Sequence, residues 1–211
     1  MVYRLPEIAR EVRVTLDCNN MSDRLLDTGD VDTLTVDEII VSKILDAVRR
    51  VHSQAPIFLL ESGHTFGDAI YWGDQGSGWV LLPDDFMRLI VFRMSDWSRA
   101  VMTAITPMDP EYQLQGSQYK GLRGTPQMPL CVLNIRPEGK VLEFYSCKTT
   151  NAQVSEAVYL PYPRVDTDGG IDICERCYNA VIYTAAALVL TTLGENDKAT
   201  AMFELANTAL N

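Results

Sequence analysis

The 211-residue chain is poor in histidine, carries no surplus of basic residues and has no long apolar run. It contains two histidines and 18 Lys+Arg against 28 Asp+Glu, which gives a net charge of -10 at pH 7. Nucleic-acid binders usually carry a basic surplus, so this balance disfavours general DNA or RNA binding. With 47% hydrophobic and 22% charged residues, the chain is expected to be globular rather than disordered.

No segment is typical of export or of a membrane span. The first residues, MVYRLPEIAREVRVTL, carry charges throughout, unlike a secretory signal. The longest apolar run is AVIYTAAALVLTTL, from Ala180 to Leu193, and it is too short to cross a bilayer comfortably. We therefore expect a soluble, intracellular protein with no membrane partner.

The cysteines do not form the pattern of a disulfide framework. Their number is odd and they are widely scattered, whereas small disulfide-stapled domains use even numbers at regular spacings. We expect free and mostly buried thiols at Cys18, Cys131, Cys147, Cys174 and Cys177.

The first part of the chain predicts two helices. Pro6 suits the first turn of a helix that runs to about Cys18, and the polar residues 19–35 predict a loop. Thr35 and Glu38 have the capping-box spacing that begins a second helix, which should end near Ser53.

The middle of the chain predicts short strands. They are rich in branched or aromatic residues and separated by Gly, Pro, Asp and Asn. A turn at 136–140 joins two of them. The polar stretch Thr106 to Pro129 predicts a long loop that is mobile in the isolated chain and ordered by a neighbouring subunit or by the tail. The expected strands are Val80 to Leu82, Arg88 to Met94, Val101 to Thr106, Leu130 to Ile135, Val141 to Ser146 and Ala157 to Tyr162.

The last part of the chain predicts a helix hairpin. A helix from about Ile171 to Leu193 should stop at Gly194, because glycine favours helix ends. Asn196 or Asp197 can cap a last helix that runs to about Leu210.

The predicted fold class is α+β. We expect a helical bundle made of the two N-terminal helices and the C-terminal helix hairpin, with a central antiparallel β subdomain inserted between the second and third helices. The corresponding domain ranges are 1–56, 57–165 and 166–211.

The spacing Cys-x-x-Cys at Cys174 and Cys177 has three interpretations: redox motif, zinc site or packing. A thioredoxin-type motif follows a strand and opens a helix, whereas a Gly-Gly turn precedes these residues and two helices follow in succession. A structural zinc site needs four ligands, and the sequence has no second such pair. On the expected helix both cysteines lie on apolar faces, so we favour packing.

The candidates for acid–base chemistry are His64, in the stretch ESGHTFGD, and the adjacent Asp84 and Asp85. No Gly-x-Ser-x-Gly elbow accompanies them, and neighbouring carboxylates on an extended chain point apart. A small enzyme that uses His64 with these acids, or a metal or redox module at Cys174 and Cys177, is the alternative interpretation. We predict no enzyme, with no catalytic, metal-binding or cofactor-binding residues.

Residues 73–78, GDQGSG, could be read as a phosphate-binding loop. They lack the Lys-Ser/Thr of that motif and do not open a helix. We expect a hairpin loop between Tyr71-Trp72 and Trp79-Val80.

Three stretches together resemble the head–tail connector adaptor proteins of tailed, short-tailed bacteriophages, of the ring-forming tail-tubular or portal-adaptor type. They are TVDEIIVSKILDAVRRVHSQAP, LPDDFMRLIVFRMSDW and ICERCYNAVIYTAAALVLTTLGENDKATAMFELANTAL. The last is similar to that family's alanine-rich helix, short turn and final helix. The resemblance covers nearly the whole chain as an order of elements.

The resemblance implies a structural virion protein of a phage or prophage that forms a ring of about twelve copies between the portal protein and the tail proteins. It implies location in the connector region of the virion, and in the cytoplasm of the bacterial host during assembly. DNA would pass through an acidic lumen without specific binding. The side chains expected at interfaces are of the types that favour them: Tyr112, Tyr119, Arg123, Arg88 and Arg93.

Overall fold

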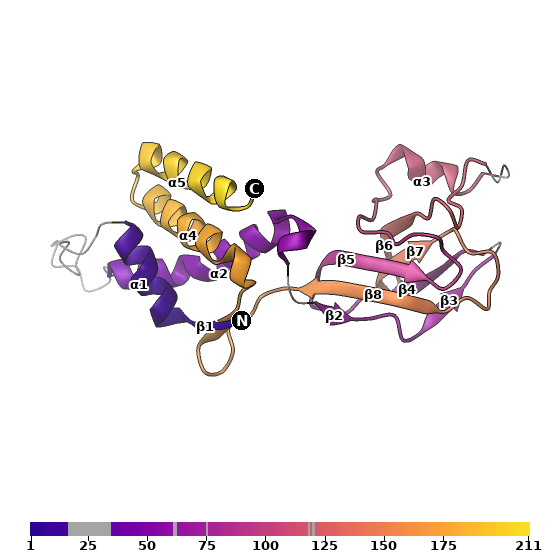
Figure 1. The fold of residues 1–211 in the computed structure, drawn as a ribbon, viewed down its shortest axis with the longest axis horizontal. Coiled ribbons are helices and arrows are strands. Elements are labelled where there is room, and N and C mark those ends of the chain that lie inside the picture. The colour runs from indigo at the N-terminus through magenta and orange to yellow at the C-terminus, as the bar shows by residue number, and fades with distance from the viewer. Residues whose placement is uncertain (17–34, 61–62, 75, 118, 120) are drawn as a thin grey trace. The chain divides into compact units, whose positions relative to one another are not determined.

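The computed structural model describes residues 1–16, 35–60, 63–74, 76–117, 119 and 121–211. The fold class is α+β, as the sequence predicts, and its sheets are antiparallel (Figure 1). The chain divides into two compact units. The first comprises Met1–Ser62 with Pro163–Asn211, and the second comprises Gly63–Tyr162.

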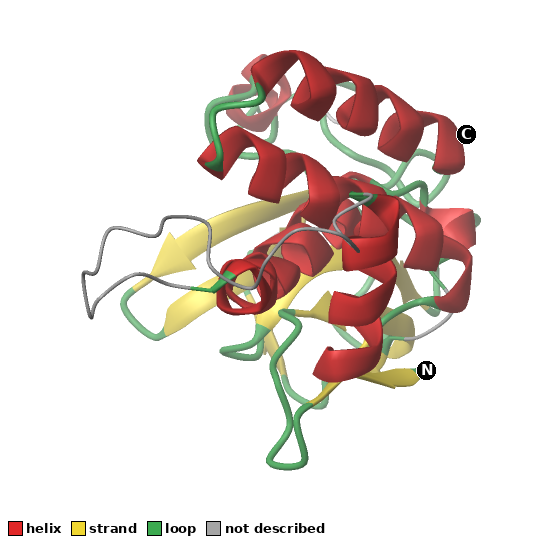
Figure 2. Ribbon diagram, turned by 90° about the vertical axis from the view of Figure 1, so that its left-hand side faces the viewer, coloured by secondary structure: helices red, strands yellow, loops and turns green. Residues whose placement is uncertain are grey.

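The first unit is mostly helical (red in Figure 2). Within it, α4 packs against α1, α2 and α5, and Figure 1 shows α5 alongside α4. A two-stranded sheet pairs β1, at the N-terminus, with β9, which precedes the last two helices. The elements are β1 (Val2–Arg4), α1 (Leu5–Thr15), α2 (Val36–Gln54), η2 (Ile57–Leu59), β9 (Gly170–Asp172), η3 (Glu175–Cys177), α4 (Tyr178–Thr192) and α5 (Asn196–Ala209).

Helix α2 begins where the capping box predicts. The Glu38 backbone N–H donates to Thr35 Oγ1, and Glu38 Oε2 accepts from the Thr35 N–H at 2.7 Å. Its apolar stripe is fully buried, which stabilises the unit by about 1.5–3 kcal/mol for each large aliphatic side chain. The stripe comprises Ile40, Ile44, Ala47, Val48 and Val51.

The expected start of the third helix is wrong. Ile171 pairs with Tyr3 in the β1–β9 ladder, and Cys174 is extended, at φ -61° and ψ 123°. Helix α4 therefore begins only at Tyr178. Pairing with the other end of the chain holds these residues out of the helix. Once begun, α4 is buried on most sides, as predicted.

The turn between α4 and α5 forms as predicted, but the cap does not. Gly194 has φ +83°, and the Glu195 N–H donates to the Leu190 carbonyl at 2.9 Å, which closes the end of α4. The N-cap residue of α5 is Glu195, which makes no side-chain cap bond, rather than Asn196 or Asp197.

The second unit contains two antiparallel sheets and the short helix α3 (Pro110–Leu114). One sheet has the order β2-β8-β5 and the other β3-β4-β7-β6. Their strands are β2 (His64–Thr65), β3 (Ile70–Trp72), β4 (Gly78–Leu81), β5 (Phe86–Met94), β6 (Cys131–Arg136), β7 (Gly139–Phe144) and β8 (Val154–Pro161).

Aromatic side chains of both sheets form one core. Phe92 of β5 stacks on Phe144 of β7 with ring centroids 6.0 Å apart, and Trp97 packs edge-on against both rings. Phe66 stacks on Phe92 from the other side of the cluster, at 5.9 Å. Each such pair contributes about 0.5–1.5 kcal/mol beyond the area it buries.

Five of the expected strands correspond to β4, β5, β6, β7 and β8, and the predicted turn at 136–140 joins β6 to β7. The expected strand from Val101 to Thr106 is wrong. Its residues make isolated bridges to different strands, since Val101 pairs with Phe92 and Ile105 pairs with Val132. The expected loop at 19–35 lies almost entirely outside the described residues.

Within the described ranges, no helix combines the length and the apolar character needed to cross a membrane.

Helix α2 also buries a histidine. His52 is 3% exposed, and its Nε2 accepts a bond from the Cys174 N–H at 3.5 Å. Burial lowers the pKa of His52 to about 4, although Asp172 opposes the shift. The imidazole is therefore neutral in the folded protein.

We predict that this histidine weakens the first unit in acid. Between about pH 6.5 and pH 4, His52 is protonated in the unfolded chain but stays neutral in the folded chain. The free energy of unfolding therefore falls as pH falls, by about 3 kcal/mol in total. Denaturant unfolding followed by far-ultraviolet circular dichroism should show about 2 kcal/mol of this loss by about pH 5.

His52→Gln should remove that part of the pH dependence, whereas the matched control His64→Gln, at an exposed position, should retain it. Equal pH dependence of the His52→Gln variant and the unsubstituted chain would contradict the assignment.

Candidate functional site

Large apolar side chains are exposed at several positions between residues 102 and 128, here called the apolar segment. Two of them are almost fully exposed, Met108 at 94% and Tyr119 at 76%. The sequence of this segment holds two acids and two bases, on a chain whose net charge is -10. The exposed set comprises Met102, Met108, Leu114, Tyr119, Leu122 and Met128.

A surface that is apolar, charge-balanced and rich in Met and Tyr has the composition of a protein interface core. The apolar segment is therefore the candidate functional site of the described chain, as a protein-binding surface.

Helix α3 has a defined beginning inside this segment. Asp109 Oδ2 accepts from the Thr106 N–H at 2.6 Å and from the Thr106 hydroxyl at 2.9 Å. The Thr106 bonds hold the pKa of Asp109 below its usual value. Pro110 then occupies the first helical turn, where its missing N–H costs nothing.

Gln115 ties the two arms of the apolar segment together. It is buried, its Nε2 donates to the Glu111 carbonyl at 2.9 Å, and its Oε1 accepts from the Gly124 N–H at 2.9 Å. Gly124 lies close to Ser146. A Cβ added at Gly124 would fall 2.4 Å from the Ser146 Oγ. These contacts give the expected loop a defined shape, and its mobility in the isolated chain stays a prediction.

The apolar segment contacts the four-stranded sheet of the second unit at β6. Ile105 bridges Val132, and the Asn134 amide donates to the Tyr112 hydroxyl at 3.5 Å. Because β6 is the last strand in the order β3-β4-β7-β6, the segment lies at one edge of that sheet. Figure 1 shows α3 beside this edge.

A buried carboxylate is paired with several donors in the sheet next to the segment. Glu143 is 2% exposed and accepts bonds from Arg136 Nε at 2.7 Å, from Asn134 at 3.3 Å and from the Tyr145 hydroxyl. Burial, followed by the Glu143 bond, raises the pKa of Tyr145 far above its usual value. The Arg136 guanidinium also lies 3.8 Å from the centre of the Trp79 ring. A charge buried with this many donors fixes the sheet rather than offering a reactive group.

The structure places the five predicted interface residues in two places. Tyr112, Tyr119 and Arg123 belong to the apolar segment, whereas Arg88 and Arg93 lie on β5 in the other sheet. Arg93 donates to the Trp97 carbonyl at 3.4 Å. Sequence reasoning missed Met108, Leu122 and Met128. The signal available was a high density of large apolar residues without helical or strand periodicity.

His64 and Asp85 meet at one tyrosine. The Tyr159 hydroxyl donates to Asp85 Oδ1 at 2.8 Å, and the His64 ring packs edge-on to the Tyr159 ring at 5.8 Å. Burial, then Asp85, raises the pKa of Tyr159 to about 12, so the phenol stays protonated. Asp84 is exposed beside them. This arrangement anchors Tyr159 in the core, and Glu61 and Ser62 of the same stretch lie outside the described residues.

The expected hairpin loop at 73–78 is confirmed for its described residues. Strands β3 and β4 pair through Tyr71 and Trp79, and the Gly73 N–H donates to the Ser77 carbonyl at 2.9 Å. A hairpin turn replaces the helix start that a phosphate loop needs.

Cys174 and Cys177 are free, buried thiols, 2% and 0% exposed. Contrary to the sequence expectation, they follow a strand, β9, and precede a helix, α4, which is the order that a redox motif uses. Redox exchange needs an accessible thiolate, however, and both sulfurs are covered. No three His, Cys, Asp or Glu side chains in the described part of the chain are placed to hold a metal ion.

No protein-family model matches this chain, and a search of curated proteins gives no significant match. The candidate site therefore stands on its exposure, charge and anchoring contacts.

We predict that Cys174→Ser with Cys177→Ser leaves any assembly function intact. Stability should fall by about 1–3 kcal/mol, because two buried thiols become hydroxyls that need partners. Denaturant unfolding measures the loss. Release of a bound metal, or loss of a redox activity, on substitution would refute the packing interpretation.

We also predict that the apolar segment drives self-association when charge repulsion is screened. At about 1 M salt the Debye length falls to about 3 Å, so copies of this acidic chain can approach. Met108→Ser with Leu122→Ser and Met128→Ser should reduce association in sedimentation velocity, with less than about 0.5 kcal/mol change in unfolding free energy per site.

The matched control is Phe58→Ser, an equally exposed apolar side chain in the first unit. An equal reduction of self-association by the control would show that general surface hydrophobicity, rather than the segment, is responsible.

Proposed function

We propose that this protein is a head–tail connector adaptor, a structural virion protein that forms a ring between the portal and the tail of a tailed phage or prophage. The observation that carries the proposal is the apolar segment, a charge-balanced stretch of an acidic chain that exposes several large apolar side chains. Exposed apolar side chains at this density favour contact with other proteins, which would suit an assembly role.

The three stretches that carry the resemblance form well-defined elements, which supports the proposal. The first gives the capped helix α2, the second gives β5 with the aromatic core around Phe92, and the third gives α4 and α5 joined at Gly194. We read this arrangement as a helical bundle, supplied by both ends of the chain, with an inserted β subdomain.

Ring formation needs two different surfaces on each copy, one for each neighbour. The net charge of -10 opposes association of free copies at low salt, so a portal ring would template assembly by holding copies close together. An acidic lumen would let DNA pass, because it repels the phosphate backbone. The protein would lie in the connector of the virion, and in the host cytoplasm before assembly.

The test is to mix the purified chain with the portal protein encoded beside it and to image the product by electron microscopy. We expect a monomeric chain in low salt that adds a second ring to the portal. The Met108→Ser, Leu122→Ser, Met128→Ser variant should add none, and Phe58→Ser should behave as the unsubstituted chain.

A portal without added density, together with turnover of a small substrate that depends on His64, would overturn the adaptor proposal in favour of an enzyme.

A further inference from the structure

Strand β3 is an open edge of the four-stranded sheet. Ile70, Tyr71 and Trp72 pair with β4, and among the described strands β4 is the only one beside them. The sequence of β3 contains no charged residue and no proline, which commonly protect a sheet edge from a further strand. This edge is therefore suited to pairing with an extended segment of another chain.

The backbone of β3 shows which groups such a segment would use. The Gly73 N–H donates to the Ser77 carbonyl at 2.9 Å, so these two residues form a hydrogen-bonded pair. Bonded pairs alternate along an antiparallel ladder, which makes Tyr71 and Trp79 the next one. The N–H and C=O groups of Tyr71 are therefore directed at β4, whereas those of its two neighbours point away from the sheet.

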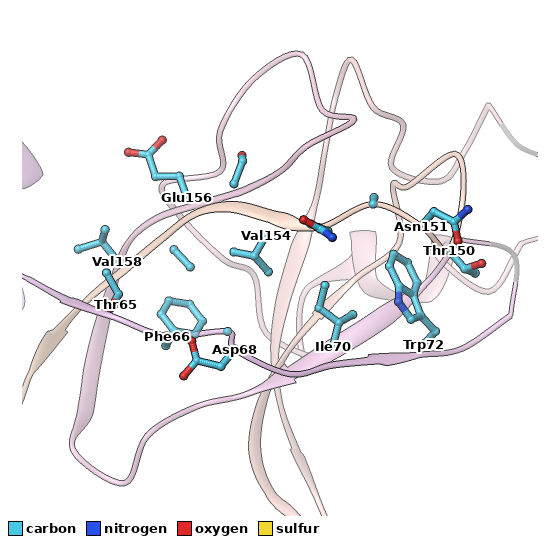
Figure 3. A pocket seen from close by; sticks show the side chains of 15 residues that line it. Thr65, Phe66, Asp68, Ile70, Trp72, Thr150, Asn151, Val154, Glu156 and Val158 are labelled. Carbon is cyan, nitrogen blue, oxygen red and sulfur yellow. The ribbon is translucent and has the colours of Figure 1, made fainter.

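An open cleft of about 930 Å³ borders this edge and is lined in part by Ile70 and Trp72. Figure 3 shows it between two stretches of chain, residues 65–72 below and residues 150–158 above. All of its exposed lining side chains are polar, which suits the polar backbone of an incoming strand better than a large apolar side chain. The neutral ones are Thr65, Thr150, Asn151, Gln153 and Ser155.

The charged residues around the edge are acidic. Asp68 and Glu156 line the cleft, both are exposed, and the described lining residues include no base. Asp68 precedes β3 and the exposed Asp74 follows it, so both ends of the edge carry a carboxylate. Charge complementarity therefore favours a segment with basic residues near its ends.

On the opposite face of the sheet from the cleft, Tyr71 belongs to a row of stacked groups. Its ring lies at 10° to the Trp79 ring of β4, with centroids 5.8 Å apart, and the Arg136 guanidinium lies 3.8 Å from the centre of the Trp79 ring. Tyr71 is 44% exposed and lies on the edge strand. A guanidinium on an added strand would extend this row by stacking on Tyr71.

We propose that the edge of β3 binds an extended, basic segment of another protein as an added strand. The segment's backbone bonds to the outward groups of Ile70 and Trp72, an arginine opposite Tyr71 stacks on its ring, and basic side chains near the ends pair with the acids. The net charge of -10 disfavours a second copy of this chain as the occupant. The site lies at the edge opposite β6, and the inference does not depend on the adaptor role.

A short capped peptide tests the strand addition. It carries a central arginine followed outward on each side by threonine, valine and lysine, so that its threonines and lysines share the cleft face. Hydrogen exchange followed by nuclear magnetic resonance should show the Ile70 and Trp72 amides slowed by about tenfold or more when the peptide binds. The Tyr71 amide should change little, because it is already bonded to β4.

This alternation of protected amides is the signature of an added strand. Absence of binding at millimolar peptide, or binding without the alternation, would overturn the inference. Protection that appears without peptide and rises with protein concentration would identify a second copy as the occupant and would also overturn it.

Matched peptides and variants test the side-chain contacts apart from misfolding. Threonine in place of the peptide's arginine should weaken binding to the unsubstituted chain about threefold, and should make no difference to the Tyr71→Thr variant.

Glutamate in place of both lysines should weaken binding about tenfold, and Asp68→Lys with Glu156→Lys should reverse that preference. The control Glu138→Lys, at an exposed acid in the turn between β6 and β7, should keep the original preference. Peptide preferences that are unchanged by Tyr71→Thr and by the charge reversal would refute the proposed contacts.

Discussion

The packing of Phe92 against Phe66, Trp97 and Phe144 is the interaction on which the architecture of the second unit depends. Phe92 lies on β5 and Phe144 on β7, so this contact joins two sheets that share no strand. Once the two sheets are packed together, β3 and β6 remain as the edge strands of the four-stranded sheet. The apolar segment lies at the β6 edge. The proposed function uses that edge of the sheet.

Charge decides how such surfaces can be used. At -10 per copy, like charge keeps free chains apart in low salt, and only a charge-balanced or oppositely charged surface lets two copies approach. The apolar segment is charge-balanced, with two acids and two bases in its sequence. Hydrophobic contact would supply most of the affinity, and the charges would fix register and partner, as they commonly do at protein interfaces.

Local chemistry in the sequence predicted the elements that depend on near neighbours. The capping box of Thr35 and Glu38, the stop at Gly194 and the turn at 136–140 each require a few adjacent residues, and each forms. The predictions that proved wrong concern residues whose partners are distant in the sequence. Ile171 leaves the expected helix to pair with Tyr3 from the other end of the chain. Residues 101 to 106 bridge two separate strands, so they never form one of their own.

The same distinction applies to the candidate site. Length and residue type singled out Tyr112, Tyr119 and Arg123, but the exposure of Met108, Leu122 and Met128 follows from packing that no local pattern encodes. Native mass spectrometry of the purified chain with its portal tests the adaptor role most directly. We expect one bound copy per portal subunit, filled cooperatively, and scattered substoichiometric binding or none would contradict that role.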